Sequence, residues 1–240
     1  MAKTALVTGG TRGIGKAISE TLKAKGYTVA ANYGGNDGAA AEFSRETGIK
    51  VYKFDVADYD AVGAGLKAIE ADLGPIEVLV NNAGITRDAP FHKMTLAQWQ
   101  EVINVDLTSA FNVTRQVWDG MRERGWGRVI NISSINGQKG QFGQTNYSAA
   151  KAGMHGFSMA LAQEVAKKGV TVNTVSPGYI GTDMVMAVPE EVRNKIIAGI
   201  PVGRLGKPEE IAGLVSYLAS DLAGFITGAN LAINGGQHMM

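Results

Sequence analysis

Two side chains four residues apart, Tyr147 and Lys151, have the types and spacing needed for proton transfer. Residues at this spacing project from one face of a helix, so a helix here would direct both into one cleft. A free phenol has a pKa of about 10, and a cation beside it favours the phenolate. Lowering that pKa by roughly 2 to 3 units needs about 3 to 4 kcal/mol, which one ammonium in a partly dry cleft could supply. The pair therefore predicts an acid-base tyrosine, with a chance pairing on an exposed helix as the alternative.

The elements that must position this pair alternate between short β-rich runs and longer helical patterns. Strands are expected at 4–8, 27–33, 49–56, 76–82, 127–134, 170–177 and 230–235, and helices near 13–25, 38–47, 58–73, 95–124, 145–168 and 208–220. The strand runs are almost continuously apolar, as strands buried on both faces should be. We predict an α/β fold, a single-domain Rossmann-type doubly wound parallel sheet of about seven strands with helices on both faces, over residues 1–240.

Composition excludes several classes of function. The 240 residues are 45% hydrophobic, and 23 basic residues face 22 acidic ones, so neither a nucleic-acid partner nor a polybasic membrane contact is expected. Without cysteine there is no disulfide or thiol catalysis, and three scattered histidines show no metal-ligand spacing, so no metal site is expected. The opening apolar run is too short for a signal peptide, and no run approaches the length of a membrane span. We expect a soluble, cytoplasmic protein.

A glycine-rich turn follows the first strand and leads into a helix pattern. Glycines let backbone N–H groups approach a pyrophosphate, and the helix N-terminus adds a partial positive charge, so the turn predicts a dinucleotide site rather than an ordinary loop. Its candidate cofactor-binding residues are Gly9, Thr11, Arg12, Gly13, Ile14 and Gly15.

Other strand ends should border the same crevice, because ligands of such sheets bind beyond the carboxyl ends of the strands. Asp55 could accept a hydrogen bond from an adenine amine, while Pro177 and Gly178 suit a wall beside a nicotinamide. For the asparagines after the fourth strand, bracing of the fold and cofactor contact are both open. The remaining candidates here are Asn82, Ala83 and Gly84.

The end of the second strand bears on the choice between NAD and NADP. An acidic residue there would receive the ribose 2′-hydroxyl and repel a 2′-phosphate. Residues 32–35 read Asn-Tyr-Gly-Gly, the first carboxylate is Asp37, and Arg12 lies in the glycine turn. We therefore predict NADP(H), with a merely solvated Arg12 as the alternative.

Taken in order, TGGTRGIG, NNAG, Asn104, Ser134, YxxxK and PG resemble the short-chain dehydrogenase/reductase family over essentially the whole chain. The resemblance implies that Tyr147 is the general acid and that Ser134 hydrogen-bonds the substrate carbonyl. It also implies that Lys151 binds the nicotinamide ribose and stabilises the phenolate, and that Asn104 holds a water chain. Within the family, the segments GWGRVINISSINGQKGQFGQTNYSAAKAG and VTVNTVSPGYIGTDM resemble members that reduce acetoacetyl-CoA, and the R configuration is implied by the family in the same way.

The polar, glycine-rich segment between Ser134 and Tyr147 is expected to border an acyl-CoA substrate. Gln141 and Gln144 could donate to a thioester carbonyl, and Phe142 and Tyr179 could wall off a short acyl chain, a solvated loop being the alternative. The resemblance further implies a substrate lid near 182–208 and a homotetramer. Two other functions are open at this point: reduction of 3-oxoacyl groups on acyl carrier protein, and a non-catalytic NADP(H) sensor, which would not need Ser134, Tyr147 and Lys151 together.

Overall fold

The computed structural model describes residues 2–239 and contains one sheet of seven strands, all paired in parallel, in the order β3-β2-β1-β4-β5-β6-β7. The strands are β1 (Thr4–Val7), β2 (Thr28–Tyr33), β3 (Lys50–Lys53), β4 (Ile76–Asn81), β5 (Gly127–Ile132), β6 (Val170–Pro177) and β7 (Asn230–Ile233). The chain winds outward from β1 in one direction and from β4 in the other, so the order reverses between these two strands. The predicted doubly wound α/β sheet is confirmed.

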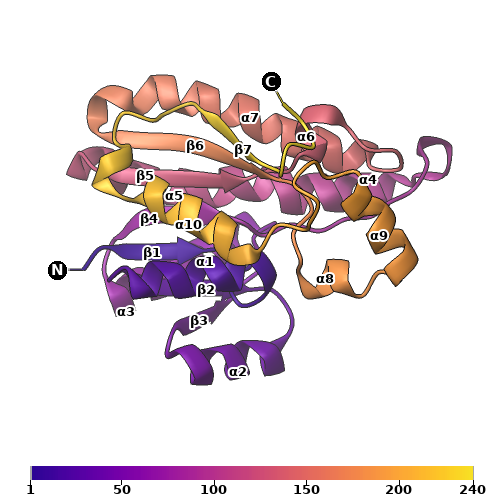
Figure 1. Ribbon diagram of the computed structural model, residues 1–240. Helices are drawn as coiled ribbons and strands as arrows, with labels where there is room; N and C mark the ends of the chain where they lie inside the picture. Colours follow the sequence, from indigo (N-terminus) through magenta and orange to yellow (C-terminus); the bar gives the residue numbers. More distant parts are fainter. Residues whose placement is uncertain (1, 240) are drawn as a thin grey trace.

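Ten α-helices within residues 2–239 connect and cover the strands. They are α1 (Gly13–Ala24), α2 (Asp37–Thr47), α3 (Tyr59–Leu73), α4 (Leu96–Ile103), α5 (Ser109–Arg124), α6 (Asn136–Lys139), α7 (Thr145–Val165), α8 (Asp183–Met186), α9 (Glu190–Ala198) and α10 (Pro208–Ala219). Figure 1 shows α1 and α10 side by side across one face of the sheet, and α8 and α9 beyond the end at which the strand arrows stop.

Two apolar clusters hold the helices to the sheet, one on each face. The first joins α1 and α10 to the strands through Ile18, Leu22 and Ile211. The second joins α3 and α5 through Ile69 and Met121. All five side chains are fully buried, and each contributes roughly 1.5–3 kcal/mol of transfer free energy. Helices therefore cover both faces of the sheet. The residues that follow the strands lie at the carboxyl ends of the strands, which these helices do not cover.

The structure corrects one expected helix. The pattern at 95–124 predicted a continuous helix, but a π-helical turn, η2 (Asn104–Thr108), separates α4 from α5. In this turn the Ser109 N–H donates to the Asn104 carbonyl, five residues back. Such turns are uncommon and cluster at functional sites. The periodicity of apolar residues cannot reveal a single turn of this kind.

Strands β3, β5 and β7 end two or three residues before the predicted limits, because the chain leaves the sheet to form turns. After β3, for example, the Asp55 carboxylate accepts a hydrogen bond from the Ala57 N–H at 2.9 Å. The segment expected to be a lid, 182–208, contains the helices α8 and α9, which the sequence pattern did not indicate.

None of the helices within residues 2–239 is both long and apolar enough to cross a membrane.

Candidate active site

The glycine turn between β1 and α1 is built so that only glycine fits at two of its positions. Gly9 has φ +60°, where a side chain is strained, and a Cβ there would lie 3.2 Å from the Ala83 Cα. A Cβ on Gly15 would collide with the Gly9 carbonyl and lie 2.6 Å from the Asn82 side-chain nitrogen. Within the described chain no side chain caps the α1 N-terminus, so its N–H groups are open to an anion. This cradle fits a dinucleotide pyrophosphate.

Asn82 holds the turn in place rather than pointing away from it. Its side-chain nitrogen donates to the carbonyls of Thr8 (2.9 Å) and Gly9 (3.2 Å), and the Asn82 N–H donates to the Thr8 hydroxyl at 2.9 Å. The neighbouring Asn81 braces β4 against β5 through Asn131, at 2.8 Å. Both side chains therefore brace the fold, and the contact of Asn82 with a cofactor stays a prediction.

The first carboxylate after β2 is paired with a lysine. Asp37 is exposed and forms an ion pair with Lys53 on β3, at 2.9 Å. Asn32 lies near the end of β2, where an acidic residue would favour NAD. It is buried and accepts a hydrogen bond from the Gly9 N–H at 3.3 Å. Arg12 is exposed directly before α1. The Asp37 carboxylate is therefore paired with a cation, and Arg12 is an exposed base beside the glycine turn.

Gly178 is closely approached by the segment that follows β7. A Cβ at this position would lie 2.8 Å from the Asn234 Cα and 2.9 Å from the Gln237 side-chain oxygen. The C-terminal segment after β7 thus requires glycine at this position, and the wall beside a nicotinamide stays a prediction. Pro177 ends β6, and its carbonyl accepts a hydrogen bond from the Ile135 N–H at 2.8 Å, which fixes the chain just after Ser134.

Tyr147 and Lys151 lie on α7, as their spacing predicted, and Ser134 follows β5. The Lys151 Nζ lies 5.5 Å from the centroid of the Tyr147 ring. It donates to the Ile132 carbonyl at 3.0 Å and lies 3.3 Å from the carboxylate of Asp106. Strand β5 and helix α7 therefore bring the predicted proton donor, its hydroxyl neighbour and a cation into one cluster.

The electrostatics of this cluster correct the expected pKa. Burial is the largest influence and raises the pKa of Tyr147 above its ordinary value. Lys151 and the Ser134 hydroxyl act in the opposite direction, while the carboxylates of Asp106 and Asp88 raise the pKa further. The predicted effect of the lysine has the right sign, but the net shift is wrong, because the desolvation of the phenol outweighs one cation.

Asn104 opens the π turn η2, and two residues later this turn carries Asp106, which the sequence analysis missed. Asp106 is completely buried, and its Oδ1 accepts a hydrogen bond from the Ile85 N–H at 2.8 Å. Residues two apart on an α-helix point about 200° apart, so a candidate at Asn104 gave no reason to consider Asp106. In the structure Asn104 is exposed, and Asp106 is the residue of this turn that faces Lys151. The available signal was an acid between two apolar residues, Val105 and Leu107.

The predicted substrate residues are only partly brought together. Gln144 is held from both ends, since its nitrogen donates to Asp88 and its oxygen accepts from Asn136, each at 2.9 Å. Gln141 is exposed, and Phe142 is 85% exposed, so this aromatic ring does not form a wall in this structure. Tyr179 lines a small cavity together with Ile200 and Ile233.

A doubly wound sheet with this glycine turn and a tyrosine-lysine pair at its carboxyl edge defines a dinucleotide-dependent oxidoreductase. A family model described as enoyl-(acyl carrier protein) reductase matches residues 9–238. Acetoacetyl-CoA reductases of Shinella zoogloeoides and Paracoccus denitrificans are each 66% identical to this chain, over 238 and 239 residues, and the match covers 99% of this chain and 99% of the relative. A 3-oxoacyl-(acyl-carrier-protein) reductase of Vibrio harveyi is 47% identical over 240 residues, 99% of this chain and 98% of the relative.

The chain belongs to the short-chain dehydrogenase/reductase family, as its motifs indicated, and it is an oxidoreductase that uses a nicotinamide cofactor.

Proposed function

We propose that this protein reduces acetoacetyl-CoA to (R)-3-hydroxybutyryl-CoA with NADPH, in the formation of polyhydroxybutyrate. The observation that carries the proposal is the 66% identity to acetoacetyl-CoA reductases over almost the whole chain, joined to the Ser134, Tyr147 and Lys151 cluster beside the glycine cradle. The lower identity to the carrier-protein reductase, 47%, favours a coenzyme A thioester over a carrier-protein thioester.

In this proposal four side chains of the chain carry the chemistry. When bound, the nicotinamide supplies the hydride. Tyr147 gives its proton to the carbonyl oxygen, and Ser134 donates a hydrogen bond to the same oxygen. Lys151 offsets the charge that develops on the phenol, and Asn104, at the start of the π turn, holds the water that returns the proton. The raised pKa of Tyr147 keeps the phenol protonated and ready to donate near neutral pH.

The glycine turn supplies the cofactor site. Gly9, Gly13 and Gly15 admit the pyrophosphate to the α1 N-terminus, and Thr11 and Ile14 complete the turn. Arg12 faces the 2′-phosphate of NADPH, a choice supported by the pairing of Asp37 with Lys53, which leaves no unpaired carboxylate at the end of β2 within the described chain. The strand ends at Asp55, Ala83, Gly84 and Pro177 border the adenine and nicotinamide sides of the crevice.

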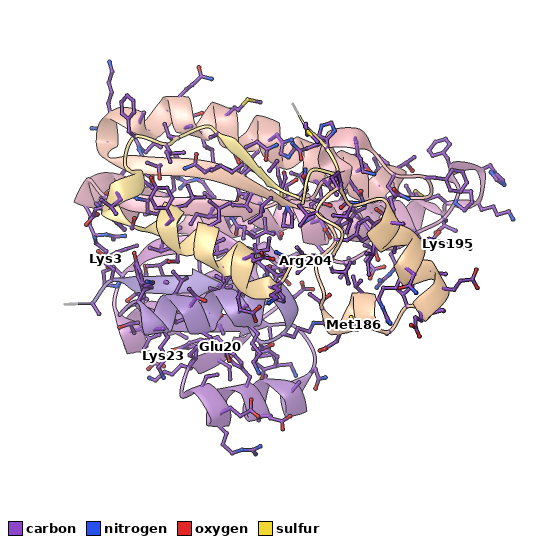
Figure 2. The ribbon with its side chains drawn as sticks, viewed as in Figure 1. Lys3, Glu20, Lys23, Met186, Lys195 and Arg204 are labelled. Carbon is purple, nitrogen blue, oxygen red and sulfur yellow. The ribbon has the colours of Figure 1, made fainter. Side chains whose placement is uncertain are left out.

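A lid over the acyl chain is the proposed role of residues 182–208. The two ends of the segment lie together, because the Gly181 N–H donates to the Gly206 carbonyl (2.8 Å) and the Gly206 N–H to the Tyr179 carbonyl (2.9 Å). Figure 2 shows Met186 on α8 and Lys195 on α9, both in the part of the chain between Gly181 and Gly206. Beneath it, Tyr179 walls the acyl chain, while Gln141, Phe142 and Gln144 meet the thioester once the loop closes.

We also propose that residues 1–240 act as one cytoplasmic domain that assembles into a homotetramer. A groove between α5 and α7 supports an interface between copies, and Phe111 in it is half exposed on the isolated chain. Its lining is mixed, with the apolar Phe111, Trp118, Phe157 and Leu161 beside the polar or charged Thr114, Arg115, Asp119, Arg122 and Glu164. Sedimentation is expected to give four copies, and a monomer would contradict the assembly.

The proposed substrate is tested by offering the same acetoacetyl group on two carriers. Initial rates of NADPH oxidation with acetoacetyl-CoA and with acetoacetyl-acyl carrier protein, at matched concentrations, give the two kcat/KM values. We expect the coenzyme A thioester to be favoured. A preference for the carrier protein would replace the proposal with the 3-oxoacyl carrier-protein reductase, and tight NADPH binding without any turnover would instead support a sensor.

A further inference from the structure

Residues 182–208 form the proposed lid segment, and its longer helix α9 lies on the surface. None of the nine residues of α9, all of which the structure describes, is buried. The Arg193 guanidinium donates to the carbonyls of Met186 (3.1 Å) and Val188 (3.5 Å), so α9 is fastened to the chain at the end of α8. Since α9 adds nothing to the core, the position of the lid segment depends on how its two ends are held.

Residues 234–238, which follow β7, contact both ends of the lid segment. Before the segment begins, the Gln237 side-chain oxygen accepts a hydrogen bond from the Tyr179 N–H at 3.4 Å. Near its other end, the Val202 N–H donates to the Gly235 carbonyl at 3.1 Å. In Figure 1 the yellow chain after β7 lies beside the orange chain that follows α9. One short stretch of chain is therefore bound to both ends.

Two glycines allow this stretch to lie so close to the lid segment. Gly235 has φ +63°, and a Cβ there would lie 2.8 Å from the Ile200 Cγ2. Gly236 has φ +84°, and a Cβ there would lie 3.2 Å from the Pro201 Cβ. Both conformations belong to the left-handed region that favours glycine. A side chain at either position would therefore push the second end of the lid segment away.

Asn234 gives the stretch its bend. This side chain is buried, its oxygen accepts a hydrogen bond from the Gly236 N–H at 3.0 Å, and its nitrogen donates to the His238 carbonyl at 2.8 Å. The first of these bonds closes an Asx turn, which fixes the backbone locally. The stretch thus has a defined shape that presents the Gln237 side chain to Tyr179.

We infer that residues 234–238 position the lid segment and thereby contribute to the binding of the acyl thioester. The inference rests on the proposed function of 182–208 as a lid. Lids move about a few residues at the ends of elements, and residues 234–238 hold the chain at such places. Tyr179, the proposed wall of the acyl chain, is fixed on both sides, since Gln237 accepts its N–H and the Gly206 N–H donates to its carbonyl at 2.9 Å. Residues 234–238 act through the lid segment and are positioning residues.

Gly235→Ala tests this contact by proteolysis, without any measurement of activity. Lys195 on α9 (Figure 2), with its side chain 74% exposed, offers trypsin a site within the lid segment. The added methyl group displaces Ile200, so the segment should open more often, and cleavage after Lys195, located by mass spectrometry, should be about tenfold faster. Gly26→Ala is the matched control, because Gly26 has φ +89° but a Cβ there meets nothing within 4 Å. Equal rates in the two variants would overturn the inference.

The same pair of variants separates the binding of substrate from the binding of cofactor. In Gly235→Ala the KM for acetoacetyl-CoA should rise by about tenfold, because contacts between the lid and the acyl thioester are lost. The Kd for NADPH should match that of Gly26→Ala, since the glycine turn is untouched. An equal rise in the KM and in the Kd for NADPH would indicate a general loss of structure and would overturn the inference.

Gln237→Ala is the second variant, should Gly235→Ala not fold. It adds no atom and removes the hydrogen bond to the Tyr179 N–H, so cleavage after Lys195 should be about threefold faster. Unchanged cleavage would overturn the inference. The proposed function fails in a different way: a wild-type protein that does not turn over acetoacetyl-CoA would remove the proposed substrate, while the difference in cleavage between Gly235→Ala and Gly26→Ala would remain.

Discussion

The Lys151 ammonium lies 5.5 Å from the centre of the Tyr147 ring, and neighbours other than the tyrosine hold it there. The Ile132 carbonyl and the Asp106 carboxylate fix it from β5 and η2. The cation is therefore in place before any proton moves, and no side-chain rearrangement is needed when charge develops on the phenol.

Tyr147→Phe removes the proposed proton donor and keeps the ring. Positioned proton transfer contributes about 10²- to 10⁴-fold to rates, so kcat should fall by at least that order while NADPH still binds. Tyr217→Phe, at an exposed tyrosine of α10, is the matched control and should keep full activity. Near-normal turnover of a folded Tyr147→Phe protein would remove this residue from the mechanism.

The sequence predicted the fold and the catalytic candidates because both depend on order along the chain. Tyr147 and Lys151 need only a helix, and Ser134 needs only to follow a strand, so the sheet topology brings them together. Asp106 could not be predicted, because a single π turn decides its direction.

Two other features escaped prediction because they depend on tertiary contacts. Gly178 is required by Asn234, which arrives 56 positions later in the chain. The net pKa of Tyr147 depends on how deeply the phenol is buried, and composition carries no information about that depth.

Gly15→Ala should abolish cofactor binding. The added methyl group meets the Gly9 carbonyl and the Asn82 side chain, so the turn must open and its N–H groups lose their alignment. Gly213→Ala is the control within another helix, α10, where a Cβ meets nothing within 4 Å. Alanine in a helix interior is favoured by about 1 kcal/mol over glycine, so this variant should bind NADPH normally and unfold at a slightly higher temperature. Titration of NADPH fluorescence measures the affinity of both variants for NADPH. Equal affinities would contradict the proposed role of the glycine turn in binding the pyrophosphate.

Arg12→Ala should change cofactor preference rather than chemistry. A hydrogen bond to a charged group is worth about 1.5–3 kcal/mol, so the KM for NADPH should rise by roughly ten- to a hundredfold while the KM for NADH stays nearly constant. The NADH rate is the internal control. An equal rise for both cofactors would place Arg12 on the pyrophosphate and leave the NADP preference unexplained.

Glu210 should make stability depend on pH in the acid range. Arg204 and the Lys207 N–H hold its carboxylate at 2.6 and 2.7 Å and lower its pKa to about 2. A lowered folded pKa gives stability that is present above the unfolded pKa, about 4.5, and is lost as pH falls towards 2. Glu210→Gln should therefore melt below the wild-type protein at pH 7, with the gap closing below pH 4.5. A difference in Tm between the two proteins that does not change with pH would instead attribute the loss of stability to packing.

The central claim is tested most directly by mixing the pure protein with acetoacetyl-CoA and following the oxidation of NADPH, and separately of NADH, at 340 nm. The account predicts turnover with NADPH, slower turnover with NADH, and the R alcohol as product. The absence of turnover with either cofactor, from a protein that binds NADPH, would contradict the proposed substrate and direct attention to other ketones.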